Sequence, residues 1–125
     1  MEQPDDGVEL DLPATPEHVR TARLVSVAVA RRLGLDDPLV EEVRLAVGEA
    51  CARHLLRSPE VSRLRLVLRD ARPGGGPGLH VSVLAPGAAP APADTDDLSL
   101  AVLRGLVPDL VVEGERVELH WPAPA

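Results

Sequence analysis

The sequence predicts an α+β fold, a two-layer sandwich in which a largely antiparallel mixed sheet is covered on one face by helices. Short segments that alternate apolar and polar residues indicate strands, and longer segments with apolar residues at helical spacing indicate helices. Their order along the chain is strand, helix, helix, strand, strand, helix, strand, strand. A length of 125 residues suits a single domain. We therefore expect one domain over residues 1–125.

The first three elements are bounded by clear local signals. The stretch VELDL alternates and predicts a strand over 8–12. A helix is expected over about 16–33, because Thr15 is a suitable N-cap, a proline follows it, and Gly34 is a suitable stop. Two aspartates and a proline then begin a second helix, which we expect over about 38–57.

The next elements form a predicted hairpin with a long connection. The stretches LRLVLR (64–69) and LHVSVL (79–84) both alternate, which indicates strands with one wet face. Between them, DARPGGGPG (70–78) is a flexible connection. It is not a phosphate-binding loop, because neither a Lys nor a helix start follows the glycines.

The last part of the chain begins with a loop rich in Pro and Gly over 85–97. Asp96 or Asp97 then caps a short helix over 98–107, which a proline ends. The stretches LVVE and RVELHW predict a closing pair of strands with a glycine in the turn. The ends of the chain, 1–6 and 122–125, are expected to be loose tails.

The composition narrows the classes of function. A net charge of −7 argues against a nucleic-acid or anionic-membrane surface, because such surfaces need a basic field. The single Cys excludes an internal disulfide framework and suits a reducing compartment. The start MEQPDDG is no signal peptide, and no apolar stretch approaches the roughly 20 residues of a membrane span. We expect a cytoplasmic protein that binds neither nucleic acid nor membrane.

Four stretches of the chain are similar to one known family: PEHVRTARLVSVAVARRLGL, LVEEVRLAVGEAC, LHVSVLAPG and LSLAVLRGLVPDLVVE. They resemble, in turn, the first helix, the nucleotide-binding helix, the adenine-reading strand, and the helix and strand after the ATP lid of the small GHKL (Bergerat-fold, histidine-kinase-like) ATPases. The RsbW-like group of these proteins acts as anti-sigma factors and serine protein kinases in bacterial partner switching. The resemblance spans nearly the whole chain and implies one GHKL-like domain.

The resemblance assigns roles on the second helix. In the family this helix carries Glu, Ala, two variable residues and Asn; the Glu activates the attacking hydroxyl and the Asn holds magnesium. Glu49 matches the Glu, and it is the catalytic base only if the protein is active. Arg53 stands at the position of the Asn. Arginine has donors only and a permanent positive charge, so Arg53 cannot ligate Mg²⁺.

Two other parts of the implied ATP site also depart from the family. Ala85 stands where the family has the Asp that binds the adenine amino group, although Gly87 two residues later is retained. The Gly-rich phosphate loop is replaced by a stretch that carries three carboxylates, which oppose a triphosphate: Asp94, Asp96 and Asp97. We therefore expect a degenerate member without catalytic residues, without ATP or magnesium as cofactor, and without a metal site.

Several of these residues also have a purely structural interpretation. Glu49 and Arg53 are spaced to pair on the helix surface, for roughly 0.3–0.5 kcal/mol. In a variant of this idea, Arg53 fills the vacated cation position and keeps the empty pocket closed. His54 and Cys51 lie on the apolar side of the helix and are predicted to be core residues. The other histidines lack metal-ligand spacing: His18, His80 and His120.

The first helix carries a local basic surface in an acidic protein: Arg20, Arg23, Arg31 and Arg32. In the family, the arginine of an Ala-Arg pair contacts protein partners, and Arg23 matches it. Arg20 lies one turn earlier on the same side. The planar guanidinium suits carboxylates of a partner. The implied partners are a STAS-domain anti-anti-sigma factor, a sigma factor, or both, and the family also implies a homodimer, which the sequence leaves open against a monomer.

Three functions remain open at this point. The favoured one is an anti-sigma-factor-like regulatory protein with a degenerate ATP site. The alternative is an active serine protein kinase that phosphorylates a STAS-domain anti-anti-sigma factor with ATP and magnesium. The third is an adaptor that holds STAS proteins and never contacts a sigma factor.

Overall fold

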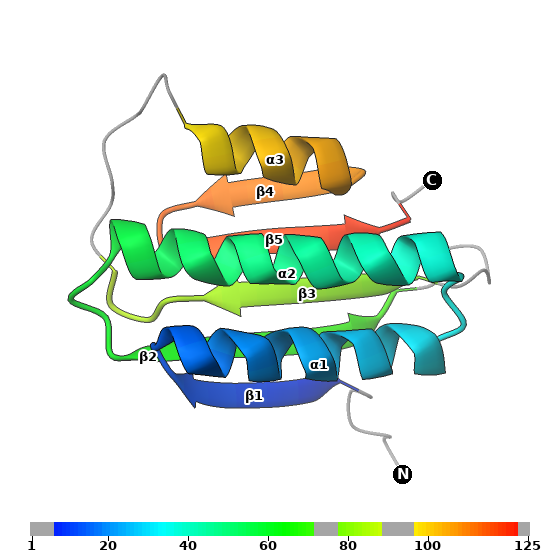
Figure 1. Cartoon of the computed structure of the whole chain (residues 1–125), viewed down its shortest axis with the longest axis horizontal. Coiled ribbons are helices and arrows are strands. Elements are labelled where there is room, and N and C mark those ends of the chain that lie inside the picture. The colour runs from blue at the N-terminus through cyan, green and yellow to red at the C-terminus, as the bar shows by residue number, and fades with distance from the viewer. Residues whose placement is uncertain (1–6, 72–77, 89–96, 123–125) are drawn as a thin grey trace, which may run out of the picture.

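The computed structural model describes residues 7–71, 78–88 and 97–122 (Figure 1). Its elements follow the predicted order: β1 (Val8–Pro13), α1 (Pro16–Arg32), α2 (Asp37–Arg57), β2 (Arg63–Asp70), β3 (Leu79–Leu84), α3 (Leu98–Leu106), β4 (Asp109–Glu113) and β5 (Arg116–Trp121). The predicted elements are confirmed with small shifts of their ends. Of the ends expected to be loose, 1–6 and 122–125, all but residue 122 lie outside the described residues. So do most of the predicted connection (72–77) and most of the predicted loop (89–96), with Asp94 and Asp96.

The five strands form one sheet in the order β1-β2-β3-β5-β4. All four neighbouring pairs are antiparallel, so the mixed component of the expected sheet is absent among the described strands. The helices cover one face of this sheet, and α2 lies between α1 and α3 (Figure 1). The predicted two-layer α+β class is confirmed. No helix in the described part of the chain is long and apolar enough to cross a membrane.

Alternation along the strands decides which face is covered. Successive side chains of a strand point to opposite faces, and the apolar set of each central strand points toward the helices. These inward residues are almost fully buried: Leu64, Leu66, Leu68, Leu79, Val81, Val83, Val117, Leu119 and Trp121. The other face of the sheet carries the polar residues of the same strands and has no helix over it (Figure 1).

Each edge strand of the sheet, β1 and β4, carries two acidic residues on one face. Glu9 and Asp11 lie on β1, opposite residues 67 and 65 of β2. Asp109 and Glu113 lie on β4, opposite residues 120 and 116 of β5. Both free edges of the sheet are therefore lined with carboxylates.

The ends of α1 and α2 contain the capping residues that the sequence predicted, with one difference in contact. Asp36 caps α2, because its side chain accepts a hydrogen bond from the Leu39 amide at 3.2 Å. Gly34 follows α1 with a φ of 88°, a conformation that glycine adopts without strain. Thr15 stands at the N-cap position of α1 but makes no side-chain cap bond; its hydroxyl lies 2.6 Å from His18 Nδ1 instead. The expected Thr15 cap is therefore right in position and wrong in its contact.

The helix α3 is the least buried of the three helices, and a few contacts hold it. Among its residues only Leu103 is fully buried. Its carboxyl end is tied to β5, because the indole nitrogen of Trp121 donates to the carbonyl of Leu106 at 3.2 Å. Its amino end is capped by Asp97, whose carboxylate accepts from the Leu100 amide at 3.0 Å.

Two glycines provide a matched test of the packing. A methyl group added to Gly78 would lie 1.7 Å from the carbonyl oxygen of Ala71, whereas one added to Gly105 in α3 meets nothing within 4 Å. We expect Gly78→Ala to destabilise the protein by about 2 kcal/mol or more, because the β2–β3 backbone must shift. Gly105→Ala is expected to stabilise it by about 0.5–1 kcal/mol, because alanine favours the helix. Urea denaturation followed by circular dichroism measures both, and equal effects of the two substitutions would contradict the prediction.

Candidate functional site

Two residues of the implied ATP site, Arg53 and Asp97, meet where α2 faces the start of α3. His54 of α2 is buried, and its Nε2 lies 3.0 Å from the carbonyl oxygen of Val83 in β3. The next residue toward the start of the helix, Arg53, reaches the opening turn of α3. This end of α2 therefore joins the sheet to α3.

Arg53 is buried and binds the start of α3 directly. Its Nη1 donates to Asp97 Oδ1 at 2.6 Å and to the hydroxyl of Ser99 at 2.5 Å. The side chains of Arg53 and Asp97 are only 9% and 10% exposed. Arg57, one turn further along α2, brings its Nη1 to 3.8 Å from the other oxygen of Asp97. The contact is a largely buried, charge-assisted pair between two helices.

The carboxylate of Asp97 is strongly stabilised in its charged form. The hydrogen bond from Arg53 is the main cause, and the Leu100 amide and the Ser99 hydroxyl add to it, so the pKa of Asp97 lies well below its usual range. Asp97 thus caps α3 and neutralises Arg53 at the same time. The sequence predicted the cap but not the ion pair, because the two residues are 44 positions apart.

These contacts correct one expectation. The spacing of Glu49 and Arg53 predicted a pair on the helix surface, but Arg53 is buried and its guanidinium bonds Asp97 and Ser99. The reason is that a guanidinium below the surface needs an anion beside it, and the capping carboxylate of α3 supplies one. The other interpretation, in which Arg53 closes the pocket, agrees with this geometry. Glu49 lies half-buried on α2.

The segment after β3 forms a tight turn. Ala85 is fully buried in the core, and its amide donates to the carbonyl of Glu115 at 2.9 Å. Gly87 has a φ of 87°, and its amide donates to the Glu115 carboxylate at 3.0 Å. A methyl side chain offers no acceptor for a nucleobase, so Ala85 contributes only to the core.

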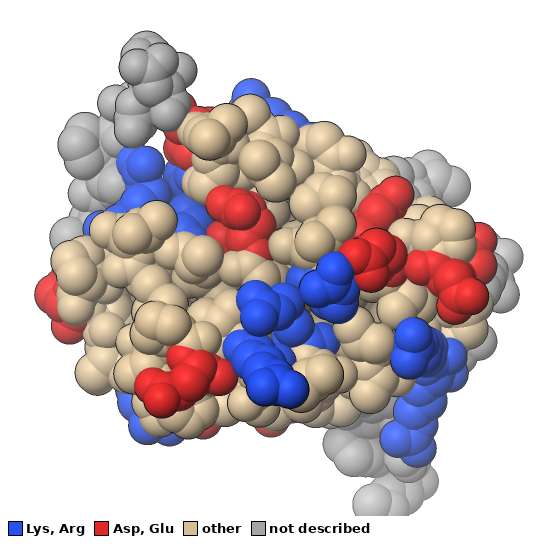
Figure 2. Space-filling view, viewed as in Figure 1, with Lys and Arg blue, Asp and Glu red and all other residues tan. Residues whose placement is uncertain are grey.

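The predicted partner residues lie on the helical face. Arg20 is exposed, and Arg23 is half-buried. The side chain of Arg23 crosses α2 at Gly48, where a methyl group would lie 3.0 Å from Arg23 Cδ and 3.1 Å from its Nη1. Close by in sequence, Leu24 is 60% exposed. Basic side chains gather near the middle of this face, with acidic groups around them (Figure 2).

The candidates Cys51 and His54 are core residues, as the sequence predicted. Cys51 is fully buried, and its burial raises the pKa of the thiol to about 12, so it carries no thiolate at neutral pH. Burial also lowers the pKa of His54, and the Val83 carbonyl opposes this shift in part. Neither side chain is arranged as a nucleophile or a base.

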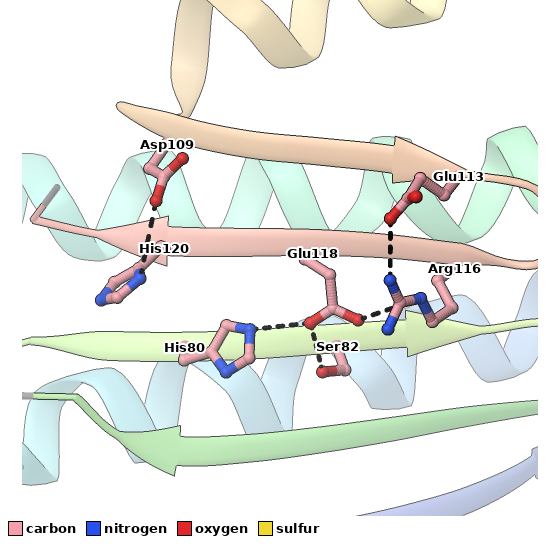
Figure 3. A network of polar contacts seen from close by, with 7 residues as sticks. All are labelled: His80, Ser82, Asp109, Glu113, Arg116, Glu118 and His120. Carbon is pink, nitrogen blue, oxygen red and sulfur yellow. Dashed lines mark hydrogen bonds and ion pairs between the residues drawn. The ribbon is translucent and has the colours of Figure 1, made fainter. Parts of the chain in front are cut away.

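The structure brings together a polar cluster that the sequence did not reveal. On the uncovered face of the sheet, His80 of β3 pairs directly with His120 of β5, and Glu118 lies beside them (Figure 3). The strands are far apart in sequence, and a strand partner that is not the next strand leaves no local signal. Alternation alone would have placed both histidines on the wet face. Within 7–71, 78–88 and 97–122, no group of three or more His, Cys, Asp or Glu is arranged to hold a metal ion.

Comparison with known proteins identifies the protein family to which this chain is similar. A family model described as the histidine kinase-like ATPase domain matches residues 12–121. The serine-protein kinase RsbW of Bacillus velezensis is 41% identical over 46 residues, which are 37% of this chain and 29% of that protein. RsbW of Bacillus subtilis is 39% identical over 51 residues, or 41% of this chain and 32% of that protein. These matches span about a third of the length of the curated relatives.

The contact between Arg53 and Asp97 generates a prediction about stability. We expect Arg53→Ala to destabilise the protein by about 2 kcal/mol, because Asp97 loses a short charge-assisted hydrogen bond and keeps only Arg57 at 3.8 Å as a cation. In a background of Asp97→Asn, which retains a capping side chain, the same substitution should cost clearly less. Urea denaturation of the four proteins of this cycle measures the coupling.

Arg44 supplies the control for this cycle. It pairs with Glu41 on the exposed surface of α2, so Arg44→Ala should change the stability little. The importance of the buried pair is contradicted if Arg53→Ala has no larger effect than Arg44→Ala.

Proposed function

Because the chain belongs to the histidine kinase-like ATPase domain family, whose model matches residues 12–121, we propose that it is an anti-sigma-factor-like regulatory protein that has lost its nucleotide chemistry. In this proposal it binds a STAS-domain anti-anti-sigma factor, a sigma factor, or both in competition. It acts by binding in the cytoplasm and catalyses no phosphate transfer.

The main observation in favour of a lost nucleotide-binding activity is the largely buried ion pair between Arg53 and Asp97. The family resemblance implies a magnesium ligand at position 53. The chain has an arginine there, and its guanidinium forms an ion pair with Asp97 of the same chain. A magnesium ion near Arg53 would be repelled, and the guanidinium has no lone pair to offer it. A nucleotide would also have to separate α2 from the start of α3, which the pair holds together.

The segment after β3 supports the same conclusion. Reading an adenine amino group requires an acceptor, and Ala85 provides only a buried methyl group. We infer that neither end of a nucleotide has its usual contacts here. The scaffold is kept and the site is filled by the protein's own side chains.

The helical face is the proposed partner surface. Arg20, Arg23 and the exposed Leu24 combine cations with apolar area in a protein whose net charge is −7. Arginine and an exposed aliphatic group are typical of sites that dock a carboxylate-bearing protein surface. Without ATP, partner exchange has to be governed from outside, and phosphorylation of the STAS partner by another kinase is one route, because added phosphate charge can break an interface.

A second function, an active serine protein kinase, has one observation in its favour. Glu49, the residue that matches the family's base, is present and half-buried on α2. The relatives matched over part of their length are named serine-protein kinases. In this alternative the protein phosphorylates a STAS-domain partner with ATP and magnesium. Homodimer formation belongs to either function and is also a proposal.

Nucleotide binding is the direct test of the first function. We expect calorimetric titration of ATP with Mg²⁺ to give no binding in the micromolar range, because Arg53 and Ala85 replace the ligands that a nucleotide needs. An active serine-protein kinase of the family serves as the positive control. Transfer of labelled phosphate to a STAS partner that disappears in Glu49→Ala would instead establish the kinase.

The partner surface is tested by recovering partners from cells. We expect the wild-type protein to co-purify with a sigma factor or a STAS protein, and Arg23→Ala combined with Arg20→Ala to reduce the recovery at least about tenfold, since lost charged contacts cost a few kcal/mol. Arg63→Ala is the matched control, because Arg63 pairs with Asp11 on the sheet, away from α1. Recovery of STAS proteins without any sigma factor would favour the adaptor, and equal recovery by all variants would exclude this surface.

A further inference from the structure

The uncovered face of the sheet carries a cluster of two histidines and their polar neighbours, which we call the histidine cluster: His80, Ser82, Asp109, Glu118 and His120 (Figure 3). His80 and His120 are directly opposite each other on β3 and β5, and their ring centroids are 5.6 Å apart. Their side chains are 29% and 21% exposed, so both rings are partly shielded from water. At this distance, a positive charge on the ring of His80 disfavours a positive charge on the ring of His120.

Only one of the two rings has a good anionic partner. Nε2 of His80 lies 2.7 Å from Glu118 Oε1, and the same oxygen accepts a hydrogen bond from Ser82 at 2.6 Å. The other oxygen of Glu118 lies 4.0 Å from Nε of Arg116. The carboxylate of Glu118 is therefore engaged by His80, Ser82 and, at a longer distance, Arg116.

His120 is less well supported. Its Nδ1 lies 3.8 Å from Asp109, which is beyond hydrogen-bond distance, and its Nε2 is buried without a hydrogen-bond partner. Burial lowers the pKa of His120, and the nearby His80 lowers it further, against a weaker opposing effect of Asp109. At neutral pH His120 is therefore uncharged, and a second proton on its ring would place a cation in a shielded position.

The charged groups around His120 come from every strand beside it. On β3 it faces His80, and on β4 it faces Asp109, with Glu113 further along that strand. On its own strand are Glu118 and Arg116, and β2 contributes Arg69, which is opposite His80. Glu113 and Glu118 are thus engaged by Arg116 and His80, and the carboxylate nearest to His120 is Asp109, which stays 3.8 Å from its Nδ1.

The position of His120 in the strand links the cluster to the opposite face of the sheet. The next residue, Trp121, points inward because successive side chains alternate, and it is fully buried. Its indole holds the end of α3 through the Leu106 carbonyl. A disturbance at His120 therefore acts on the strand end that anchors α3.

We propose that the histidine cluster is an acid-sensitive switch, in which protonation of His120 loosens the end of β5 and weakens the anchoring of α3 by Trp121. The expected direction follows from linkage. The unfolded chain takes up a proton near the ordinary histidine pKa of 6.5, whereas folded His120 resists it. The stability contributed by the neutral ring is present above pH 6.5 and is lost as the pH falls below that value.

The test uses the fluorescence of Trp121, which is the only Trp in a chain without Tyr. On acidification from about pH 7.5 to about pH 5.5, we expect acrylamide quenching of wild-type Trp121 to rise roughly twofold and reversibly. Acrylamide access is the readout, because a protonated histidine can change the emission intensity of a neighbouring indole without any loosening. His120→Gln removes the proton acceptor and should abolish the rise in this range.

A second variant and a control keep the test decisive if His120→Gln folds poorly. His80→Asn removes the neighbouring ring, so the midpoint of the transition should move to higher pH, toward the ordinary value. His18→Asn is the control, because His18 lies on α1 beside Thr15, and it should leave the profile unchanged. The proposal is overturned if His120→Gln and His80→Asn both follow the wild-type curve, since the acid response would then come from another group such as the buried His54.

Discussion

A guanidinium that is buried must have an anion beside it, and the joint between α2 and α3 satisfies this requirement for Arg53. The carboxylate of Asp97 meets it, and in the same position it caps α3. One side chain therefore fixes where α3 begins and how that helix end lies against α2. At its other end α3 is held by Trp121. The helix α3, which has a single fully buried residue, therefore has a polar contact at each terminus in addition to the packing of Leu103 and Leu106 on the core.

The sequence predicted the fold well because its signals are local. Alternating segments such as RVELHW and capping residues such as Asp36 act within a few positions, and the structure has the elements they predict. The site was harder to predict. The partner of Arg53 is 44 positions away, so the spacing to Glu49 suggested a surface pair that does not form. The pairing of His80 with His120 depends on β5 joining β3, a choice of neighbour that periodicity does not encode.

Family membership is shown for this protein, whereas the loss of the nucleotide chemistry is a proposal. The family model covers residues 12–121, and the expected RsbW-like resemblance is confirmed by partial matches to serine-protein kinases of that name. A shared fold does not carry an activity, since activity depends on particular side chains at particular positions. In the proposed function, Arg53 and Ala85 take the positions at which the resemblance implies a magnesium ligand and an adenine reader. The same framework that supports catalysis elsewhere is compatible with a protein that works by contact alone.

The carboxylates on the two edge strands have a consequence for how copies of this chain can meet. A sheet that ends in unpaired backbone groups is a template for further strands, and growth from edge to edge leads to polymers. In this sheet, an antiparallel union of two β1 strands centred on Leu10 would place Glu9 opposite Asp11, and a union of two β4 strands centred on Val111 would place Asp109 opposite Glu113. Like charges at close range oppose both unions. The carboxylates on β1 and β4, two of which are paired with Arg63 and Arg116, therefore disfavour these two edge-to-edge unions.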